Sequence, residues 1–198
     1  MFGLPHETEV YKFLSKNAVY RKFDFTAAQK TSFDEDIKKI SIIHEISDNT
    51  LHLSGSEKNE FFILEIQLKH KDYDPKNIER LTKLIDRNLL LALTYEDQVR
   101  FAVFKTVLHQ SEWQNAEDVK LTLNGYDYDT IWENTIRSVI GIADETGESL
   151  EEQIETKIED EKILKEIEKL KAKLRKEKQF NRKVEINEEI RKLEEKLR

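Results

Sequence analysis

Three polar side chains alternate near the end of an apolar stretch, FFILEIQLK, which spans residues 61–69. Glu65, Gln67 and Lys69 stand two positions apart, so in a β-strand they would project from one side at intervals of about 7 Å. An acid, an amide and a lysine gathered at one strand end are side chains of the types that bind ligands and take part in catalysis. The polar end of this stretch is therefore the first candidate for a catalytic site.

Asp48 supplies the second acid that such a site would require, because it follows another short apolar stretch at residues 41–47. Together, Asp48, Glu65, Gln67 and Lys69 resemble the metal-dependent PD-(D/E)xK nuclease core, which implies Mg²⁺ as a cofactor held by acidic and amide oxygens, with Lys69 positioning the attacking water. The sequence departs from that pattern, since no proline precedes Asp48 and Gln67 takes the place of an acid. The other interpretation is a polar strand end that pairs with its neighbours, with no catalytic residue, metal or cofactor.

Lysines are concentrated in the turn that follows, KHKDYDPKN. Asp74 and Pro75 are typical of a helix start, with the acid as N-cap and the proline in the first turn. Lys69, Lys71 and Lys76 lie beside this start, where they are candidates for contact with a nucleic-acid phosphate or another anion. An ordinary capped turn is the alternative.

Apolar periodicity and capping signals predict the elements that must position these residues. Strands are predicted at residues 41–47, 61–69, 89–95, 99–108 and 119–123. Helices are predicted to begin at Pro5, to span residues 27–40, to begin at Pro75 and to follow a cap at Asp127 or Asp129, whereas residues 19–25 are predicted to be extended. The predicted fold is α+β over residues 1–142, a mixed sheet flanked by helices whose order is compatible with a restriction-endonuclease-like core.

The composition changes after Ser149, which begins a predicted helix with a capping box to Glu152. Beyond it, isoleucines and leucines recur at spacings of four, three and four in two separate sets. The two sets are Ile163, Ile167, Leu170, Leu174 and Ile186, Ile190, Leu193, Leu197. This spacing is typical of a coiled-coil seam. Because twelve residues separate the sets, we predict a helical hairpin over residues 148–198 that turns near 179–181, with one long phase-shifted helix as the alternative.

The predicted hairpin suggests contact with other molecules in two ways. Its seam is predicted to bind a protein partner or a second copy of the chain, and a hairpin closed on itself is the alternative. Between Lys169 and Lys183 there are eight basic residues and one acid, Glu177. Gathered at a hairpin tip, these cations could contact DNA phosphates, whereas the alternative is a solvated charged face. The candidate contacts are Lys173, Arg175, Lys176, Lys178, Arg182 and Lys183.

Composition excludes several other classes of function. The chain has no cysteine, which removes thiol catalysis and Cys-ligated zinc. Its five glycines form no phosphate-cradling loop, so nucleotide hydrolysis is not expected. Residues 1–150 carry 18 basic and 26 acidic residues, a balance that argues against broad nucleic-acid affinity of the body. No apolar run approaches the roughly 20 residues that span a bilayer, so we expect a cytoplasmic protein without a membrane partner.

Several motifs along the chain resemble one family. They are the opening MFGLP, the run QLK…KDYDPKNIERLTKLI, the LTYED turn, the short SEW and WEN motifs and the ending KQFNRKVEINEEIRKL. Together they resemble an uncharacterised bacterial family, domain of unknown function 4391. The resemblance assigns no role to any residue. It implies a setting, since such proteins look like accessory members of restriction-type phage-defence systems beside helicases and DNA methyltransferases. We therefore expect a non-enzymatic accessory subunit that binds such a partner and contacts DNA.

Overall fold

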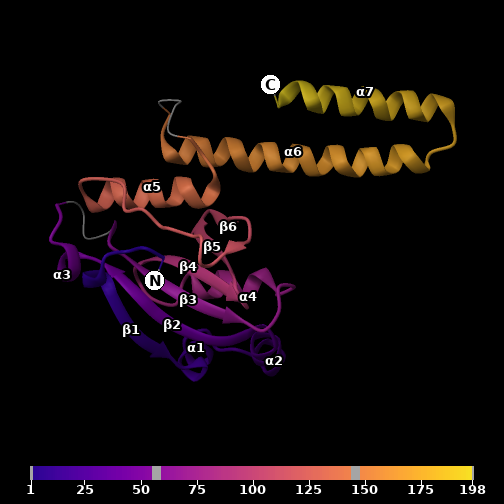
Figure 1. Ribbon diagram of the computed structural model, residues 1–198. Helices are drawn as coiled ribbons and strands as arrows, with labels where there is room; N and C mark the ends of the chain where they lie inside the picture. The colour runs from indigo at the N-terminus through magenta and orange to yellow at the C-terminus, as the bar shows by residue number, and fades with distance from the viewer. Residues whose placement is uncertain (1, 55–58, 144–147, 198) are drawn as a thin grey trace. The chain divides into compact units, whose positions relative to one another are not determined.

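The computed structural model describes residues 2–54, 59–143 and 148–197. The chain divides into two compact units, Met1–Ala143 and Asp144–Arg198. The first is an α+β domain and the second is a helical hairpin (Figure 1).

The first unit is built on a mixed seven-stranded sheet. Its strands are β1 (Glu9–Leu14), β2 (Ile37–Ile46), β3 (Phe61–Leu68), β4 (Asn88–Tyr95), β5 (Gln98–Lys105), β6 (Val107–Gln110) and β7 (Gln114–Asn115). Strands β1 to β6 lie side by side in chain order, and β7 pairs with β5. Strands β3 and β4 are parallel, and every other described pair is antiparallel. This mixed sheet confirms the predicted α+β class.

Helices lie before, between and after these strands. In the first unit they are η1 (His6–Thr8), α1 (Lys16–Lys22), α2 (Ala27–Asp36), α3 (Asp48–Leu51), α4 (Pro75–Leu81) and α5 (Tyr128–Ile140). The helix starts follow their capping signals: the Thr26 side chain accepts from the Gln29 backbone before α2, and Asp74 caps α4. Of the two candidate caps for α5, Asp127 is the one used, accepting from Thr130 N at 2.7 Å.

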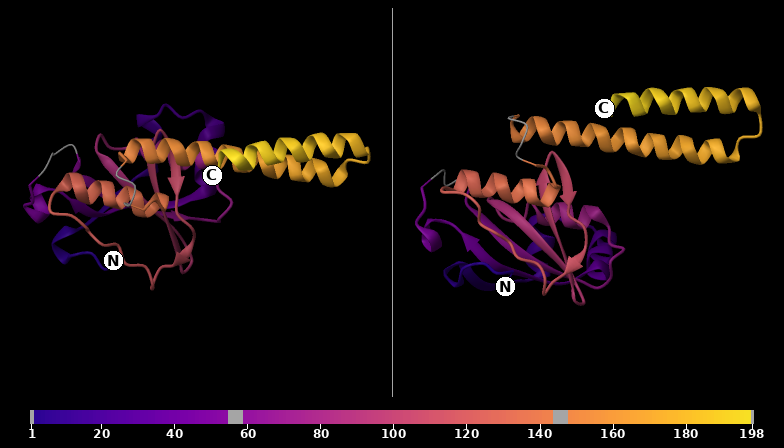
Figure 2. Two further views of the ribbon diagram at one scale, coloured as in Figure 1. Left: turned by 90° about the horizontal axis from the view of Figure 1, so that it is seen from above. Right: turned by 45° about the horizontal axis from the view of Figure 1, so that its top comes forward.

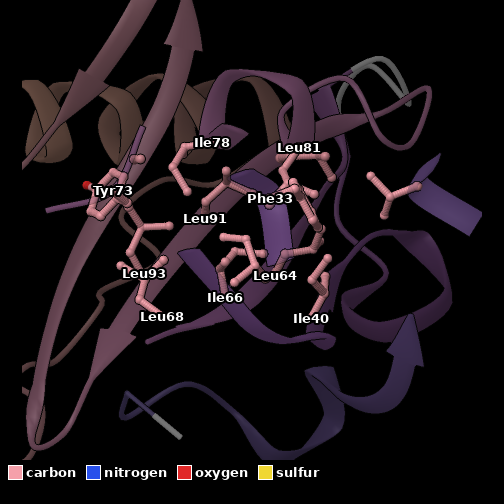
Figure 3. Close-up of a cluster of buried hydrophobic side chains, with 14 of the residues drawn as sticks. Phe33, Ile40, Leu64, Ile66, Leu68, Tyr73, Ile78, Leu81, Leu91 and Leu93 are labelled. Carbon is pink, nitrogen blue, oxygen red and sulfur yellow. The ribbon is translucent and has the colours of Figure 1, made fainter. Parts of the chain in front are cut away.

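The main apolar core lies on one face of the sheet. Phe33 of α2 and Ile78 and Leu81 of α4 are fully buried there against strand residues (Figure 3). The strand residues in contact with them include Ile40, Leu64, Ile66, Leu91 and Leu93. Burying one such side chain stabilises the fold by about 1.5–3 kcal/mol, so this layer fixes the register of β2, β3 and β4.

The N-terminal predictions were wrong in two places. The region after Pro5 forms only the short helix η1 and then strand β1, because β2 supplies hydrogen-bond partners to residues 9–14. Residues 19–25, predicted to be extended, lie mostly in α1, which begins after the Ser15 cap. The apparent alternation there also contains a helical spacing of four between Val19 and Phe23.

Two further elements differ from the predictions. Helix α2 ends at Asp36 instead of continuing to residue 40, because Ile37 and Ile40 belong to the paired strand β2. Residues 119–123 form no strand, and the short strands β6 and β7 precede them. The backbone of this segment is held instead by a hydrogen bond from Leu121 N to Phe2 O at 2.9 Å.

The second unit is a helical hairpin of α6 (Leu150–Lys176) and α7 (Phe180–Lys196). Both views in Figure 2 show the two helices side by side and antiparallel. Helix α6 begins with the predicted capping box between Ser149 and Glu152. The chain turns at residues 177–179, close to the predicted position, so the single long helix is excluded.

Candidate functional site

Glu65 and Gln67 lie on one face of β3, as their spacing predicts, and Gln67 Nε2 donates to Glu65 Oε2 at 3.3 Å. Phe61 and Ile63 precede them on the same face and are buried. The Phe61 ring packs on Trp132 of α5, with ring centroids 4.8 Å apart. The polar end of β3 therefore begins where the packing against α5 ends.

A pocket of about 290 Å³ opens beside Glu65 and Gln67. It is lined by Lys38, Glu65, Gln67, Leu68, Thr94, Glu96 and Ala116. Lys38 lies at a bulge of β2, where the pairing with β3 shifts between Ile37 and Lys39. A bulge turns a strand locally and re-aims its side chains. Lys38 is thus the cation that lines the pocket with Glu65 and Gln67, and sequence reasoning missed it because a bulge depends on the pairing between strands.

The two acidic residues of this pocket come from different positions along the sheet. Strands β3 and β4 are parallel, and Glu65 lies opposite Ala92 and Gln67 opposite Thr94. Glu96 follows the end of β4 at Tyr95, so it lies beyond Gln67 along the sheet. The pocket therefore mixes donors and acceptors without pairing its carboxylates. Among the described residues, no group of three or more histidines and acids is placed to hold a metal ion.

Lys69 lies just past the end of β3, and its side chain is engaged outside this pocket. Its Nζ donates to the carbonyl oxygen of Asp34 at 2.5 Å, and its backbone N donates to Asp36 O at 2.8 Å. Both acceptors lie at the C-terminal end of α2. Lys69 therefore ties the end of β3 to α2.

Asp48 lies at the opposite end of β3 from Gln67. Strand pairing places Ile46 beside Phe61, and Gln67 is six residues further along β3, roughly 20 Å at the rise of a strand. Ligand oxygens must lie within about 2.6 Å of a shared divalent cation. The structure brings Glu65 and Gln67 together and places Asp48 and Lys69 away from them, an arrangement that does not favour the predicted four-residue catalytic site.

The lysines of the turn after β3 are placed by contacts within the domain. Lys71 Nζ bonds to Gln98 Oε1 and lies 5.3 Å from the centre of the Trp113 ring. Asp74 Oδ1 accepts from Lys76 N at 2.9 Å, while the Lys76 side chain is exposed. These contacts favour the ordinary capped turn over an anion site.

Asp36 is a buried carboxylate that organises this turn and that sequence reasoning did not single out. Its Oδ2 accepts from Asn77 Nδ2 at 2.7 Å and from Asp74 N at 2.9 Å. His70 Nε2 lies 3.4 Å from its other oxygen. Asp36 therefore holds the turn against the end of α2. Three acids, Asp34, Glu35 and Asp36, lie between Phe33 and Ile37, so the sequence alone does not single out Asp36.

The predicted seam of the hairpin forms, and it is closed within the chain. Ile167, Ile186 and Ile190 are buried against one another. The other five predicted residues pack on them: Ile163, Leu170, Leu174, Leu193 and Leu197. The two helices of the hairpin already cover these eight residues, which favours the alternative of a hairpin closed on itself over a partner seam. A partner would meet the outer faces.

The tip of the hairpin, residues 173–183, is basic and open to solvent. All six predicted contact residues are exposed: Lys173, Arg175, Lys176, Lys178, Arg182 and Lys183. The acid of this segment, Glu177, accepts from Lys178 N at 2.7 Å and from Gln179 N at 2.9 Å. These backbone amides, with Arg182 and Lys173 nearby, hold the pKa of Glu177 below its ordinary value. The carboxylate is thus used to shape the turn.

The charge of the hairpin is strongly polarised. The tip carries six basic residues and one acid, a net charge of +5. The remainder of residues 151–198 carries nine basic and thirteen acidic residues, a net charge of −4. Because charges separated by more than about 10 Å are screened in physiological salt, an approaching polyanion would encounter the tip as a positive surface.

Comparisons with known proteins give a family and no closer relative. The profile of the family described as Domain of unknown function (DUF4391) matches residues 2–197. No curated protein and no solved structure matches the chain significantly. Within the described part of the chain, every helix is too short or too polar to cross a bilayer.

Proposed function

We propose, from the premise that this chain belongs to the DUF4391 family, that it is a non-enzymatic accessory subunit of a restriction-type phage-defence system. In this proposal it binds a helicase or DNA methyltransferase partner and contacts DNA through the hairpin tip. The partner class rests on the family resemblance described above. The DNA contact rests on the geometry of the tip.

The single observation that carries the proposal is the exposed cationic tip. Six basic side chains lie within eleven residues around the turn, and Glu177 is occupied by backbone amides. When basic side chains neutralise DNA phosphates, the DNA releases condensed counterions. The binding affinity therefore falls steeply as the salt concentration rises. The acidic remainder of the hairpin and the acidic first unit would repel DNA, which confines the contact to the tip.

The tip contact is tested by measuring the binding of a labelled 30-base-pair duplex by fluorescence anisotropy between low and physiological salt. Replacing Lys176, Lys178 and Arg182 with glutamine should reduce the slope of log affinity against log salt by about 2–3, because three phosphate contacts are lost. The matched control replaces Lys162, Lys165 and Lys196, exposed lysines outside the tip. An equal loss in both triple variants would contradict a contact confined to the tip.

The partner contact is tested separately, by affinity purification of the tagged full chain from its native host. A helicase or methyltransferase subunit should co-purify and should remain bound after nuclease treatment, because a protein contact does not depend on DNA. Recovery of such a subunit only in the presence of intact DNA would contradict direct docking.

The alternative function, a divergent Mg²⁺-dependent nuclease, is supported by one observation, the pocket that joins Lys38 with Glu65 and Gln67. The separation of Glu65 from Glu96 and from Asp48 favours the accessory role. The full chain incubated with DNA and Mg²⁺ or Mn²⁺ decides between them. Cleavage that a Glu65→Gln variant loses would overturn the non-enzymatic proposal.

A further inference from the structure

We propose that the hairpin tip binds nucleic acid with unpaired bases, and that the ring of Phe180 stacks on a base while the surrounding cations hold the backbone. This inference rests on the proposed contact between the tip and nucleic acid and specifies which form of nucleic acid is bound. It starts from the large aromatic side chain that the seam leaves outside.

Phe180 is the first residue of α7 and is 77% exposed. It does not belong to the apolar cluster between the helices. At ~100° per residue around α7, Phe180 points about 100° and Val184 about 140° away from the mean direction of Ile186 and Ile190. Val184, one turn later, is also exposed, at 41%. The Phe180 ring is therefore exposed to solvent and takes no part in the packing between α6 and α7.

The charges around this ring favour a phosphate-bearing ligand. Lys178, Arg182 and Lys183 lie within three residues of Phe180, and all are exposed. Base–aromatic stacking combined with a cationic groove is the usual means of binding single-stranded nucleic acid, because every base offers a π-face. In a regular duplex both faces of each base are already stacked. The ring therefore selects bases that are unpaired or splayed.

An anionic lipid surface is the competing ligand for a basic tip with an exposed phenylalanine. Helices that lie in a membrane interface present a continuous apolar face. The outer side of α7 offers Phe180 and Val184, and then Glu188 and Arg191 follow at helical spacing. The apolar area is therefore small, and the arrangement fits the insertion of one ring between bases better than burial in lipid.

The test measures the affinity of the full chain for a labelled 15-nucleotide single strand and for a matching duplex, at several salt concentrations. Phe180→Ala should weaken single-strand binding about tenfold, within the range of one base stack, and leave the slope against salt unchanged. Phe180→Trp should restore affinity, and Val184→Ala is the matched control. A strand carrying 2-aminopurine should change fluorescence on binding the unmodified chain and not on binding Phe180→Ala.

The outcomes separate this inference from the proposed function. Equal binding of single strand and duplex, both unaffected by Phe180→Ala, would overturn the stacking role and leave the phosphate contact standing. Binding of neither form would overturn both. Binding to vesicles of anionic lipid that depends on Phe180, with no binding to the single strand, would assign the tip to a membrane surface and overturn the inference.

Discussion

Asp36 shows how much of this fold depends on one buried carboxylate. It is 6% exposed and accepts hydrogen bonds from a side-chain amide and from a backbone N–H. Because these donors lie 38 and 41 residues away in the sequence, the carboxylate joins the end of α2 to the start of α4. Removing it would leave both donors without their acceptor, and such unsatisfied groups are costly in a low-dielectric interior.

Asp36→Ala should lower the free energy of unfolding by about 2–4 kcal/mol, since one buried and one partly buried hydrogen bond to its side chain are lost. Urea denaturation followed by circular dichroism measures the change. Glu35→Ala is the matched control, because Glu35 is the adjacent acid and is exposed. It should change stability by less than about 0.5 kcal/mol. Similar effects of the two variants would contradict the role assigned to Asp36.

The ionisation of Asp34 should make the stability of the fold depend on pH. Partial burial opposes ionisation, but the Lys16 ammonium at 2.7 Å and the Tyr20 hydroxyl at 2.6 Å hold the pKa of Asp34 below its ordinary value. A lowered folded-state pKa stabilises the fold above the unfolded-state pKa, about 4, and this contribution disappears as the pH falls through the folded-state value. The stability difference between the unmodified chain and Asp34→Asn should therefore be present at pH 6 and shrink towards pH 2.5.

Urea midpoints measured across this range check the sign of the Asp34 effect. Glu35→Gln provides the control, because its exposed carboxylate should give a difference that is small at both ends of the range. A stability difference between the unmodified chain and Asp34→Asn that grows as the pH falls would contradict the assignment.

Sequence reasoning at the residue scale worked where spacing alone decides geometry. Glu65 and Gln67 share a face because strand side chains alternate. Lys38 lies beside them only because of a bulge in β2. Asp48 is distant from them because it follows the end of β2 that pairs with the start of β3. Both depend on pairing between strands, which a single strand does not encode. Local spacing therefore predicted that Glu65 and Gln67 lie together, and it missed Lys38 and the other residues that line the pocket.

At the scale of elements, the hairpin is the feature that the sequence predicted best. Two sets of apolar residues with equal spacing and a break in phase gave both helices and the turn. The N-terminal elements were predicted less well, since the spacing of three between Val10 and Phe13 fits a helical stripe. Pairing with β2 makes this segment a strand instead, because tertiary context routinely overrides local preference.

The packed seam of the hairpin should stabilise α6 and α7 against local opening, and this stabilisation can be measured. Ile190→Ala should lower the free energy of opening of the hairpin by about 2–4 kcal/mol, because it removes buried methyl groups and leaves a cavity. Hydrogen exchange of amides within residues 150–196 measures this in the full chain. Val184→Ala, on the outer side of α7, should change protection by less than about 0.5 kcal/mol. Equal loss of protection would contradict the packing described for the seam.

At the scale of the whole molecule, charge is segregated rather than balanced. The chain has a net charge of −7 and a pI of about 5.4, yet its hairpin tip has a net charge of +5. Such a molecule should bind both to positively charged surfaces, through its acidic regions, and to negatively charged surfaces, through the basic hairpin tip.

The full chain at pH 7.5 should therefore be retained both on an anion exchanger and on heparin. The Lys176→Gln, Lys178→Gln, Arg182→Gln variant should elute from heparin at clearly lower salt while remaining bound to the anion exchanger. The Lys162→Gln, Lys165→Gln, Lys196→Gln control changes the net charge equally and should keep most of its heparin retention. Loss of retention in the control alone would place the basic surface elsewhere.

The order of the strands also has a consequence for how the chain is made. Because β1 to β6 lie side by side in the order of the sequence, each strand pairs with the one synthesised before it. Domains begin to fold during synthesis, from the N-terminus onward. A nascent chain that has emerged up to Tyr95 already contains β1 to β4 and the two helices, α2 and α4, that cover their apolar face. The sheet can thus grow on the ribosome by one edge at a time, without waiting for a strand from the far end of the chain.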